Sequence, residues 1–432
     1  MSDATVRLWG TSIGAVTWVQ AQDIGIFQFD PGFLDSGIEL APVMMPLGEG
    51  TFSFPSLSRE TFKGLPGMLA DSLPDRFGNR LIDAWLAREG RSPSSFNPVE
   101  RLCYIGRRGM GALEFHPSIS GIPSSSRKVK IDRLVDLANE ILQERAGLAG
   151  TLSGGDGDGE VLEDILKVGT SAGGARAKAV IAWNENTGEF RSGQIEAQPG
   201  FTHWLLKFDG VSNNRDKELA DPLGFGRIEY ACHLMARDAG IDMMPCRLHH
   251  ENGRSHFMTR RFDRTEDGDR LHMQSLSALM HYDFNEPGAY SYEQAIRALR
   301  LVGASHEDVV QQTLRAVFNV VIRNQDDHVK NIAFLMDREG EWRLSPAFDV
   351  CYAYNPAGQW TDRHQMSLNG KRDGFRREDI DEFLANAGIK PAKATAIVDA
   401  VIEARGRWRT FAQEAGVPET DAARIETAFR HI

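Results

Sequence analysis

The sequence predicts an α+β protein with a small β-rich N-terminal domain and a two-lobed core whose C-terminal lobe is predominantly helical. Near the N-terminus, apolar segments of strand length occur at residues 6–9, 15–18 and 24–29, with glycine or Pro-Gly turns nearby. From Leu299 onward the apolar residues follow helical spacing instead. A chain of 432 residues exceeds what one hydrophobic core usually supports, so several domains are expected.

We expect three parts along the chain. Residues 1–118 form the β-rich N-terminal subdomain, residues 119–265 a lobe with a glycine-rich loop, and residues 266–432 the helical lobe. A segment rich in Pro, Ser and Gly at 117–126 is typical of a linker between the first two. Helical spacing predicts helices over four ranges, which are Leu69–Leu86, 131–142, 392–414 and 421–429.

Composition and charge exclude several classes of protein. The net charge of −11 argues against broad binding to a phosphate backbone, because lysine and arginine dominate that kind of association. The four cysteines are scattered without C-x-x-C pairing, so neither zinc nor a disulfide framework is indicated. No apolar run reaches membrane-spanning length and the start does not resemble a signal peptide, so we expect a cytoplasmic protein that does not bind membranes.

The most informative segment is N-Q-D-D-H-V-K-N at residues 324–331, followed by L-S-P-A-F-D-V at residues 344–350. Asp326 and Asn331 have the D-x-x-x-x-N spacing of a protein-kinase catalytic loop, and Asp349 falls where a second metal-binding aspartate belongs. Phosphoryl transfer needs oxygen ligands for Mg²⁺ and a carboxylate beside the attacking hydroxyl. The sequence therefore predicts Asp326 as catalytic base and Asn331 and Asp349 as Mg²⁺ ligands.

The surroundings of this loop agree with that interpretation. Apolar residues from Val310 to Val321 predict a buried helix that leads into the loop. After the loop, two short strands are expected at 332–335 and 342–344, joined by a turn at 337–340. A helix, an acidic loop, a hairpin and an aspartate follow one another in this order in a kinase C-terminal lobe.

Three neighbouring residues leave alternatives open. Asp327 beside Asp326 either raises the pKa of one carboxyl or adds an outer-sphere contact to a metal ion. His328 is more often a packing or hydrogen-bonding residue in such a position than a catalytic acid. Lys330 either neutralises the γ-phosphate or is solvated.

Two upstream segments are candidates for nucleotide binding. Residues 168–178, V-G-T-S-A-G-G-A-R-A-K, are glycine-rich, and glycines allow backbone N–H groups to approach phosphates closely, although an ordinary hairpin turn is the alternative. Lys207 lies in the apolar strand 203–208, as the ATP-contacting lysine of a kinase does. Glu229, in a helix expected at 225–238, is a candidate partner for Lys207.

Taken together, these motifs resemble the HipA family of serine/threonine kinases, which are the toxins of type II toxin–antitoxin pairs. The resemblance covers nearly the whole chain and implies a kinase-like core with an ATP-binding lobe at 119–265. The matching segments are G-L-P-G-M-L-A-D-S-L-P-D-R-F-G (64–78), S-A-G-G-A-R-A-K (171–178), the strand ending at Lys207, R-R-F-D-R (260–264), D-D-H-V-K-N (326–331), L-S-P-A-F-D-V (344–350) and S-L-N-G-K-R-D (367–373).

The resemblance implies roles for particular residues. Phe257–Arg260 corresponds to the hinge strand that holds adenine, and Ser171 to a serine that the kinase phosphorylates in itself, with Thr170 as an alternative. A phosphate at Ser171 would repel ATP and switch the enzyme off. The residues implied in ATP binding are Ser171, Ala172, Gly173, Gly174, Lys178, Lys207, Arg260, Phe262, His328 and Lys330.

The resemblance also implies cofactors and partners. ATP and Mg²⁺ are the expected cofactors, and the expected partner is a small helix-turn-helix antitoxin similar to HipB, through which any contact with DNA would occur. The expected substrate is a translation component such as an aminoacyl-tRNA synthetase, in a system connected with persistence. Two alternatives stay open: a catalytically silent HipA-fold protein that binds an antitoxin or regulates, and a small-molecule or lipid kinase.

Overall fold

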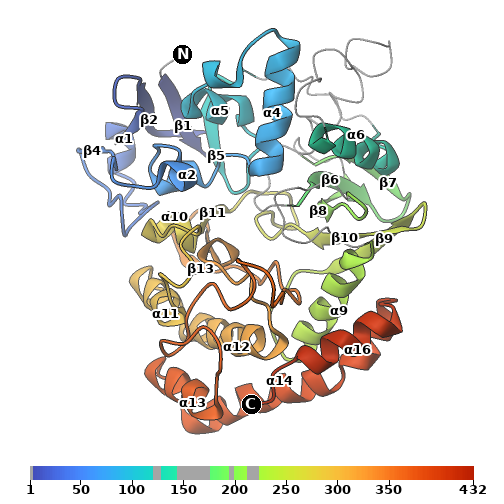
Figure 1. Ribbon diagram of the computed structural model, residues 1–432. Coiled ribbons are helices and arrows are strands. Elements are labelled where there is room, and N and C mark those ends of the chain that lie inside the picture. The colour runs from blue at the N-terminus through green and yellow to red at the C-terminus, as the bar shows by residue number, and fades with distance from the viewer. Residues whose placement is uncertain (1–2, 120–127, 144–175, 194–198, 212–222) are drawn as a thin grey trace. The chain divides into compact units, whose positions relative to one another are not determined.

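The computed structural model describes residues 3–119, 128–143, 176–193, 199–211 and 223–432 (Figure 1). The chain forms two compact units. Unit 1 comprises Met1–Ala41, Met45–Leu223 and His249–Met273, and unit 2 comprises Pro42–Met44, Gly224–Leu248 and Gln274–Ile432. The mixture of helices and sheets confirms the predicted α+β class. The expected division of the sequence into three parts stays a prediction.

The N-terminal part of unit 1 is an antiparallel five-stranded sheet with the order β4-β3-β2-β1-β5. Alternate side chains such as Val6, Leu8 and Val16 are buried, which is the period-two pattern of a sheet with one face on the core. The strands expected near 6–9, 15–18 and 24–29 are therefore present. Their bounds are β1 Asp3–Leu8, β2 Thr11–Val19, β3 Ile24–Phe29, β4 Thr51–Phe52 and β5 Leu113–His116.

The helix predicted over Leu69–Leu86 is wrong, because two helices occur there, α3 (Gly67–Ala70) and α4 (Arg76–Arg88). Pro74 interrupts the helix, since proline lacks an N–H group and disfavours helical geometry in the preceding residue. Asp75 then begins α4 as its N-cap, and its carboxylate accepts the Gly78 N–H at 2.6 Å. The other helices of this part are α1 (Pro31–Leu34), α2 (Arg59–Phe62), the short 3-10 helix η1 (Pro93–Ser95) and α5 (Pro98–Ile105).

A second five-stranded sheet has the order β7-β6-β8-β10-β9. One hydrophobic core joins this sheet to α4 and to α6 (Ile131–Gln143), with Leu81, Leu134 and Leu206 among its buried residues. The amphipathic helix expected at 131–142 is thus confirmed as α6. The strands are β6 Lys178–Asn184, β7 Glu189–Ser192, β8 Thr202–Lys207, β9 Cys246–Glu251 and β10 Arg254–Arg260.

Unit 2 is mainly helical, as expected for the C-terminal lobe (Figure 1). Its central helix α12 buries residues on nearly all sides, including Val317, Phe318 and Val321. The helices are α9 Phe225–Asp238, α10 Leu276–Met280, α11 Tyr292–Leu301, α12 His306–Ile322, η2 Val329–Asn331, α13 Arg377–Asn386, α14 Pro391–Gly406, α15 Trp408–Glu414 and α16 Glu419–Ala428. A small sheet has the order β11-β12-β13, with bounds β11 His272–Ser275, β12 Ala333–Met336 and β13 Trp342–Leu344.

The single helix predicted over 392–414 is wrong, because α14 ends at Gly406 and α15 begins at Trp408. Glycine is a poor helix former, and the turn at Arg407 buries Trp408 completely. The Trp408 indole N–H donates to the Ala422 carbonyl at 2.9 Å, which fixes α15 against the following segment.

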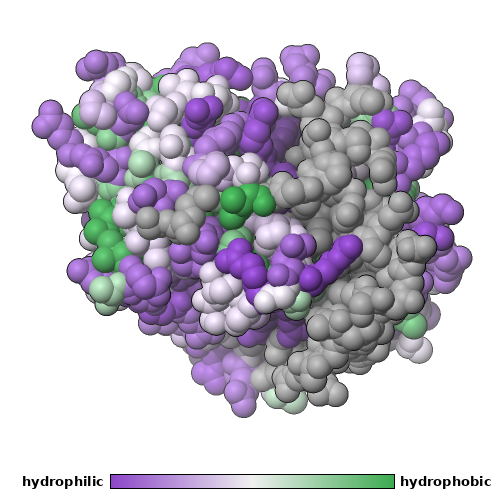
Figure 2. All heavy atoms as spheres, turned by 90° about the horizontal axis from the view of Figure 1, so that it is seen from above, coloured by the Kyte–Doolittle hydropathy of each residue, from purple (hydrophilic) through white to green (hydrophobic). Residues whose placement is uncertain are grey.

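The surface is that of an ordinary globular protein. On the face shown in Figure 2, hydrophilic side chains predominate and hydrophobic ones form small groups. Within the described ranges, the large hydrophobic side chains that are exposed are Leu223 and Leu301. No helix that the structure describes is long and apolar enough to cross a membrane.

Candidate active site

The loop at residues 324–331 begins where the buried helix α12 ends. Arg323 caps the helix in the left-handed region with φ of 57°, which stops the helix and turns the chain into the loop. The Arg323 guanidinium donates to the Ala428 carbonyl at 2.6 Å, so the turn is fixed from the C-terminal segment. The 3-10 helix η2 then leads into β12, and β12 pairs with β13 as the hairpin that the sequence predicts.

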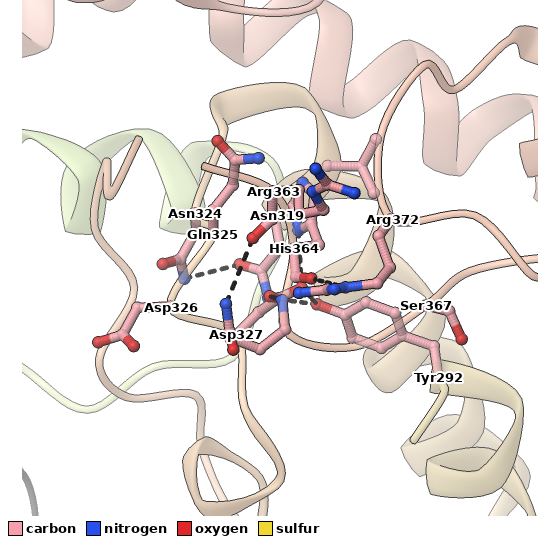
Figure 3. A network of polar contacts seen from close by, with 12 residues as sticks. Tyr292, Asn319, Asn324, Gln325, Asp326, Asp327, Arg363, His364, Ser367 and Arg372 are labelled. Carbon is pink, nitrogen blue, oxygen red and sulfur yellow. Dashed lines mark hydrogen bonds and ion pairs between the residues drawn. The ribbon is translucent and has the colours of Figure 1, made fainter. Parts of the chain in front are cut away.

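Two consecutive carboxylates in the loop have opposite environments. The Asp326 side chain is 49% exposed, whereas the Asp327 side chain is only 1% exposed. Figure 3 shows Asp326 turned away from the polar network that surrounds Asp327. The Oδ1 atom of Asp326 accepts the indole N–H of Trp360 at 2.8 Å. The half-exposed carboxylate at 326 is the one that a substrate can reach.

Asp327 is held by three donors. Its Oδ2 accepts the Tyr292 hydroxyl and the His364 Nδ1 group, each at 2.7 Å, and its Oδ1 accepts the Gln365 backbone N–H at 2.7 Å. Burial alone raises the pKa of this carboxyl, but His364, Tyr292 and Gln365 outweigh burial and the pKa is lowered. The raised pKa that the sequence leaves open for one carboxyl of the pair therefore does not belong to Asp327, whose three donors anchor it.

Asn331 and Asp349 line the same small hollow, together with Asn324, Asp327 and His328. The Asn331 side-chain N–H donates to the Asp326 carbonyl at 2.8 Å, which leaves its amide oxygen to serve as a ligand. The hollow has a volume of about 30 Å³ and is therefore large enough for a water-sized group. The two predicted metal ligands therefore lie together, next to the predicted base.

The backbone at Asp349 has an uncommon conformation. Its φ of 53° lies in the left-handed region, where residues other than glycine are infrequent and are concentrated at functional sites. Asn324 ties this residue to the loop, because its side-chain NH₂ group donates to the Asp349 carbonyl at 3.3 Å. The same group donates to the side-chain oxygen of Asn319 at 3.1 Å. The loop and the aspartate beyond the hairpin thus form one structural element.

The donor set fits Mg²⁺, a hard cation that takes oxygen ligands and retains several waters. One carboxylate and one amide oxygen are sufficient when phosphate oxygens complete the shell. In the described residues no group of three or more His, Cys, Asp or Glu side chains is arranged around a metal position, and a site of this kind does not need one. Asn324 lines the same hollow, and its buried Oδ1 atom accepts no hydrogen bond from the residues that the structure describes.

Two of the lysines predicted to bind ATP lie opposite each other on adjacent strands of unit 1. Lys178 of β6 pairs in register with Lys207 of β8, and Lys207 pairs with Phe257 of β10. The Lys178 ammonium lies 3.7 Å from the Asp75 carboxylate, and both side chains are almost fully buried. Asp75 is thus a candidate functional residue without a role in the sequence analysis, although it stands in the quoted motif at 64–78.

The segment after the predicted hinge strand contains a buried charge cluster centred on Asp263, which is 0% exposed. Asp263 accepts hydrogen bonds from the guanidinium groups of Arg261 and Arg264 at 2.7–2.9 Å and from the Gly111 N–H at 2.7 Å. Burial raises the pKa of the Asp263 carboxyl, but the two arginines outweigh burial and hold the pKa far below its usual range. The R-R-F-D-R motif therefore joins the hinge to the N-terminal part of the chain.

The other predicted residues have varied positions. Ser171, Ala172, Gly173 and Gly174 lie outside the described residues, as does Thr170. Arg260 contacts Glu266 at 3.5 Å at the end of β10, and Phe262 is partly buried beside the Asp263 cluster.

His328 and Lys330 both pack on the Phe284 ring, at 5.6 Å between ring centroids and at 5.2 Å from the ammonium to the centroid. This packing agrees with the interpretation of His328 as a packing residue of the loop and not a catalytic acid. Glu229 is buried on α9 in unit 2 whereas Lys207 belongs to unit 1, so their pairing stays a prediction.

The fold is that of α+β proteins in which a β-rich N-terminal domain precedes a core of two parts. In this chain the core contains the loop with Asp326 and Asn331. Two family models match the chain: the HipA N-terminal domain at residues 4–116 and the HipA-like C-terminal domain at residues 170–418. The chain belongs to the HipA family.

Two proteins of known name are similar to the chain. HipA of Shewanella oneidensis MR-1, in a structure of that toxin–antitoxin system with HipB and operator DNA, has a TM-score of 0.66 and 16% sequence identity, covering 98% of this chain and 95% of that one. The two proteins therefore share a fold. The putative kinase Y4mE of Sinorhizobium fredii is 30% identical over 195 residues, which are 42% of this chain and 39% of that protein. The chain thus spans about two fifths of the length of this curated relative.

Proposed function

We propose that the protein is a Mg²⁺-dependent serine/threonine protein kinase and the toxin of a HipA/HipB-like module. The observation that carries this proposal is the shared position of three groups in unit 2. Asn331 is bonded to the backbone of Asp326 and borders one hollow with Asp349, while the Asp326 carboxylate is half exposed. Membership of the HipA family and the likeness to a putative kinase support the same conclusion.

Each group has a chemical role in this proposal. Asn331 and Asp349 hold Mg²⁺, which when bound neutralises charge on the ATP phosphates. Asp326 accepts the proton of a serine or threonine hydroxyl while the hydroxyl oxygen forms a bond to the γ-phosphorus. The bond between the γ-phosphorus and the β–γ bridging oxygen breaks, and ADP leaves with its electron pair.

Nucleotide binding is proposed for the residues that the family motifs indicate. Lys207 and Lys178 lie on adjacent strands and carry the positive charge that phosphates require. The remaining residues proposed to contact ATP are Ala172, Gly173, Gly174, Arg260, Phe262, His328 and Lys330. Ser171 is the proposed autophosphorylation site, with Thr170 as the alternative, and a phosphate there would repel ATP.

The proposed partner is a small HipB-like antitoxin, which the family and the shared fold support. Contact with DNA then occurs through that partner, since the net charge of −11 disfavours direct binding. The proposed substrate is a translation component such as an aminoacyl-tRNA synthetase in the cytoplasm, a proposal that the family resemblance alone supports.

One experiment tests the enzyme assignment. Purified protein is incubated with labelled ATP and Mg²⁺, first alone and then with a cell lysate, and labelled proteins are identified by mass spectrometry. We expect label on residue 170 or 171 of the chain itself and on a lysate protein, and none with EDTA or with Asp326→Asn. Equal labelling by Asp326→Asn would remove Asp326 from the role of base, and no labelling by the wild type would favour the silent homologue.

A further inference from the structure

A closed ring of contacts joins the two neighbouring aspartates of the loop. The Asp327 Oδ1 atom accepts the Gln365 backbone N–H at 2.7 Å, and the Gln365 side-chain N–H donates to the Trp360 carbonyl. The Trp360 indole N–H donates to the Asp326 Oδ1 atom at 2.8 Å. Because Asp326 and Asp327 are consecutive, the ring returns to its starting point. Asp327 thus holds the segment that supplies a hydrogen bond to Asp326.

The segment that carries Trp360 is anchored at several further points. Gln365 also donates to the Arg363 carbonyl at 3.3 Å, and Gln325 of the loop donates to the Asp362 carbonyl at 3.4 Å. Inside the segment, the Asn355 N–H donates to the Thr361 carbonyl at 3.1 Å. These contacts hold the backbone on both sides of the tryptophan, and the one from Gln325 ties the segment to the loop.

Asp327 itself is fixed in one orientation. An arginine side chain can only donate hydrogen bonds, and an Arg430 nitrogen lies 2.8 Å from the His364 Nε2 atom. Nε2 must therefore accept, and the His364 hydrogen resides on Nδ1, from which it is donated to Asp327. Arg430 in turn contacts Asp373 at 2.7 Å. Through Arg430, the contacts of Asp327 and His364 thus extend to the C-terminal segment.

The hydrogen bond from Trp360 restricts a torsion that is otherwise loose. Rotation of a carboxylate about its terminal bond has broad, roughly two-fold preferences, and Asp326 is half exposed, so packing alone does not fix it. An indole N–H is a donor only, and its bond to Oδ1 assigns the two oxygens different tasks. Oδ1 is occupied and Oδ2 is left to receive a proton.

We propose that Trp360 is a positioning residue for phosphoryl transfer, which holds Oδ1 of Asp326 so that Oδ2 faces the attacking hydroxyl. This inference rests on the proposed kinase function. It also assigns a task to the second aspartate, since Asp327 places Trp360 through Gln365. Correct placement of a reacting group accounts for a large part of a rate enhancement, and a small misplacement lowers the rate about tenfold to a hundredfold.

The test uses variants that remove one N–H group. Trp360→Phe retains an aromatic ring without the donor, and benzothienylalanine at position 360 keeps the full shape with sulfur in place of N–H. Trp408→Phe is the matched control, because it removes the indole hydrogen bond of a fully buried tryptophan whose N–H donates to Ala422 and not to the loop. The measurements are the rate constant for incorporation of phosphate from ATP into the chain, the ATP concentration at half-saturation, and the melting temperature.

For both changes at position 360, we expect the rate constant at saturating ATP to fall by about tenfold or more. The ATP concentration at half-saturation and the melting temperature should not change. Trp408→Phe should lower the melting temperature and leave the rate constant unchanged. A wild-type rate at position 360, a faster rate, or a loss confined to ATP affinity and melting temperature would each overturn the positioning role. The kinase proposal fails separately, if Asp326→Asn retains the wild-type rate or the wild type shows no transfer.

Discussion

Asp327 in unit 2 and Asp263 in unit 1 are both fully buried carboxylates whose pKa lies below its usual range, yet their partners differ. Asp263 is bound by two guanidinium groups and a backbone N–H. Asp327 is bound by a tyrosine, a histidine and a backbone N–H. Permanent cations suit a fixed junction, since they keep their charge at all physiological pH values.

The different partners of the two carboxylates match their different positions. Asp263 accepts the Gly111 N–H, its partner Arg261 donates to the Gly109 carbonyl, and the side chains of Asp263 and Arg261 are almost entirely buried. Asp327 adjoins the half-exposed Asp326 and, through Gln365, the segment that contacts it. The first carboxylate stabilises the architecture of unit 1, while the second organises a loop whose neighbour is open to substrate.

The largest expected effect comes from Asp326→Asn, which sharpens the contrast between exposed and buried carboxylates. Loss of a general base lowers a rate by about 10²–10⁴-fold, and we expect phosphate incorporation to fall by about 10³-fold. Because the side chain is half exposed, the melting temperature should not change. Asp421→Asn, at an exposed surface ion pair, is the control and should match the wild type. A rate within a few fold of the wild type would remove the base.

The second prediction compares the stability and the rate of two variants, Asp263→Asn and Asp327→Asn. Removing one partner from a buried ion pair leaves a buried charge uncompensated and costs about 3–5 kcal/mol of stability. We therefore expect Asp263→Asn to unfold at markedly lower denaturant, with a normal rate for the molecules that remain folded. Asp327→Asn should instead lower the rate per folded molecule. If both variants changed only stability, the distinction drawn between the two carboxylates would not hold.

Asp349→Asn tests metal binding. The change removes one negative charge, and asparagine tolerates the left-handed conformation with φ of 53°, so the backbone is not strained further. We expect affinity for Mg²⁺·ATP to fall about tenfold in calorimetry, which corresponds to about 1.4 kcal/mol. Asp23→Asn is matched to it, since Asp23 is another left-handed aspartate, with φ of 55°, and lies in unit 1. Equal weakening by both variants would argue against a ligand role.

The last prediction is a pH dependence of stability in unit 1, without an effect on the rate constant. Burial lowers the pKa of His272 to about 4, below its usual 6.5, so unfolding takes up a proton in this range. The resulting stability is present above about pH 6.5 and is lost as pH falls toward 4, by about 1.4 kcal/mol per pH unit for one proton. His203 and His256 of unit 1 have similarly lowered pKa values. We therefore expect His272→Gln to reduce this slope by the share of one proton in denaturant titrations, and the exposed His306→Gln to leave it unchanged. The lowered pKa values of Asp263 and Asp327 act in a lower window, below about pH 4.

Local patterns in the sequence predict much of the fold. The buried helix α12, the hairpin β12–β13 and the amphipathic helix α6 all follow from periodicity over short stretches. The helix predicted through Leu69–Leu86 is wrong because Pro74 and the N-cap residue Asp75 mark the start of a second helix within that range. The sequence therefore contained that signal.

Only part of the candidate site can be predicted from the sequence. D-x-x-x-x-N spacing indicates Asp326 and Asn331, since both lie in one loop. The partners of Asp327 have no such signal, because Tyr292, His364 and Gln365 lie 35 to 38 residues away in the sequence and meet it only through tertiary packing. The same holds for the ion pair between Lys178 and Asp75, whose residues come from two separate motifs.

The most direct test of the account is a crystal structure of the protein with Mg²⁺ and a non-hydrolysable ATP analogue. We predict that the metal ion is bound by the Asn331 side-chain oxygen and the Asp349 carboxylate, with the Asp326 carboxylate beside the γ-phosphate position. A metal ion and phosphates bound away from these three side chains would contradict the account.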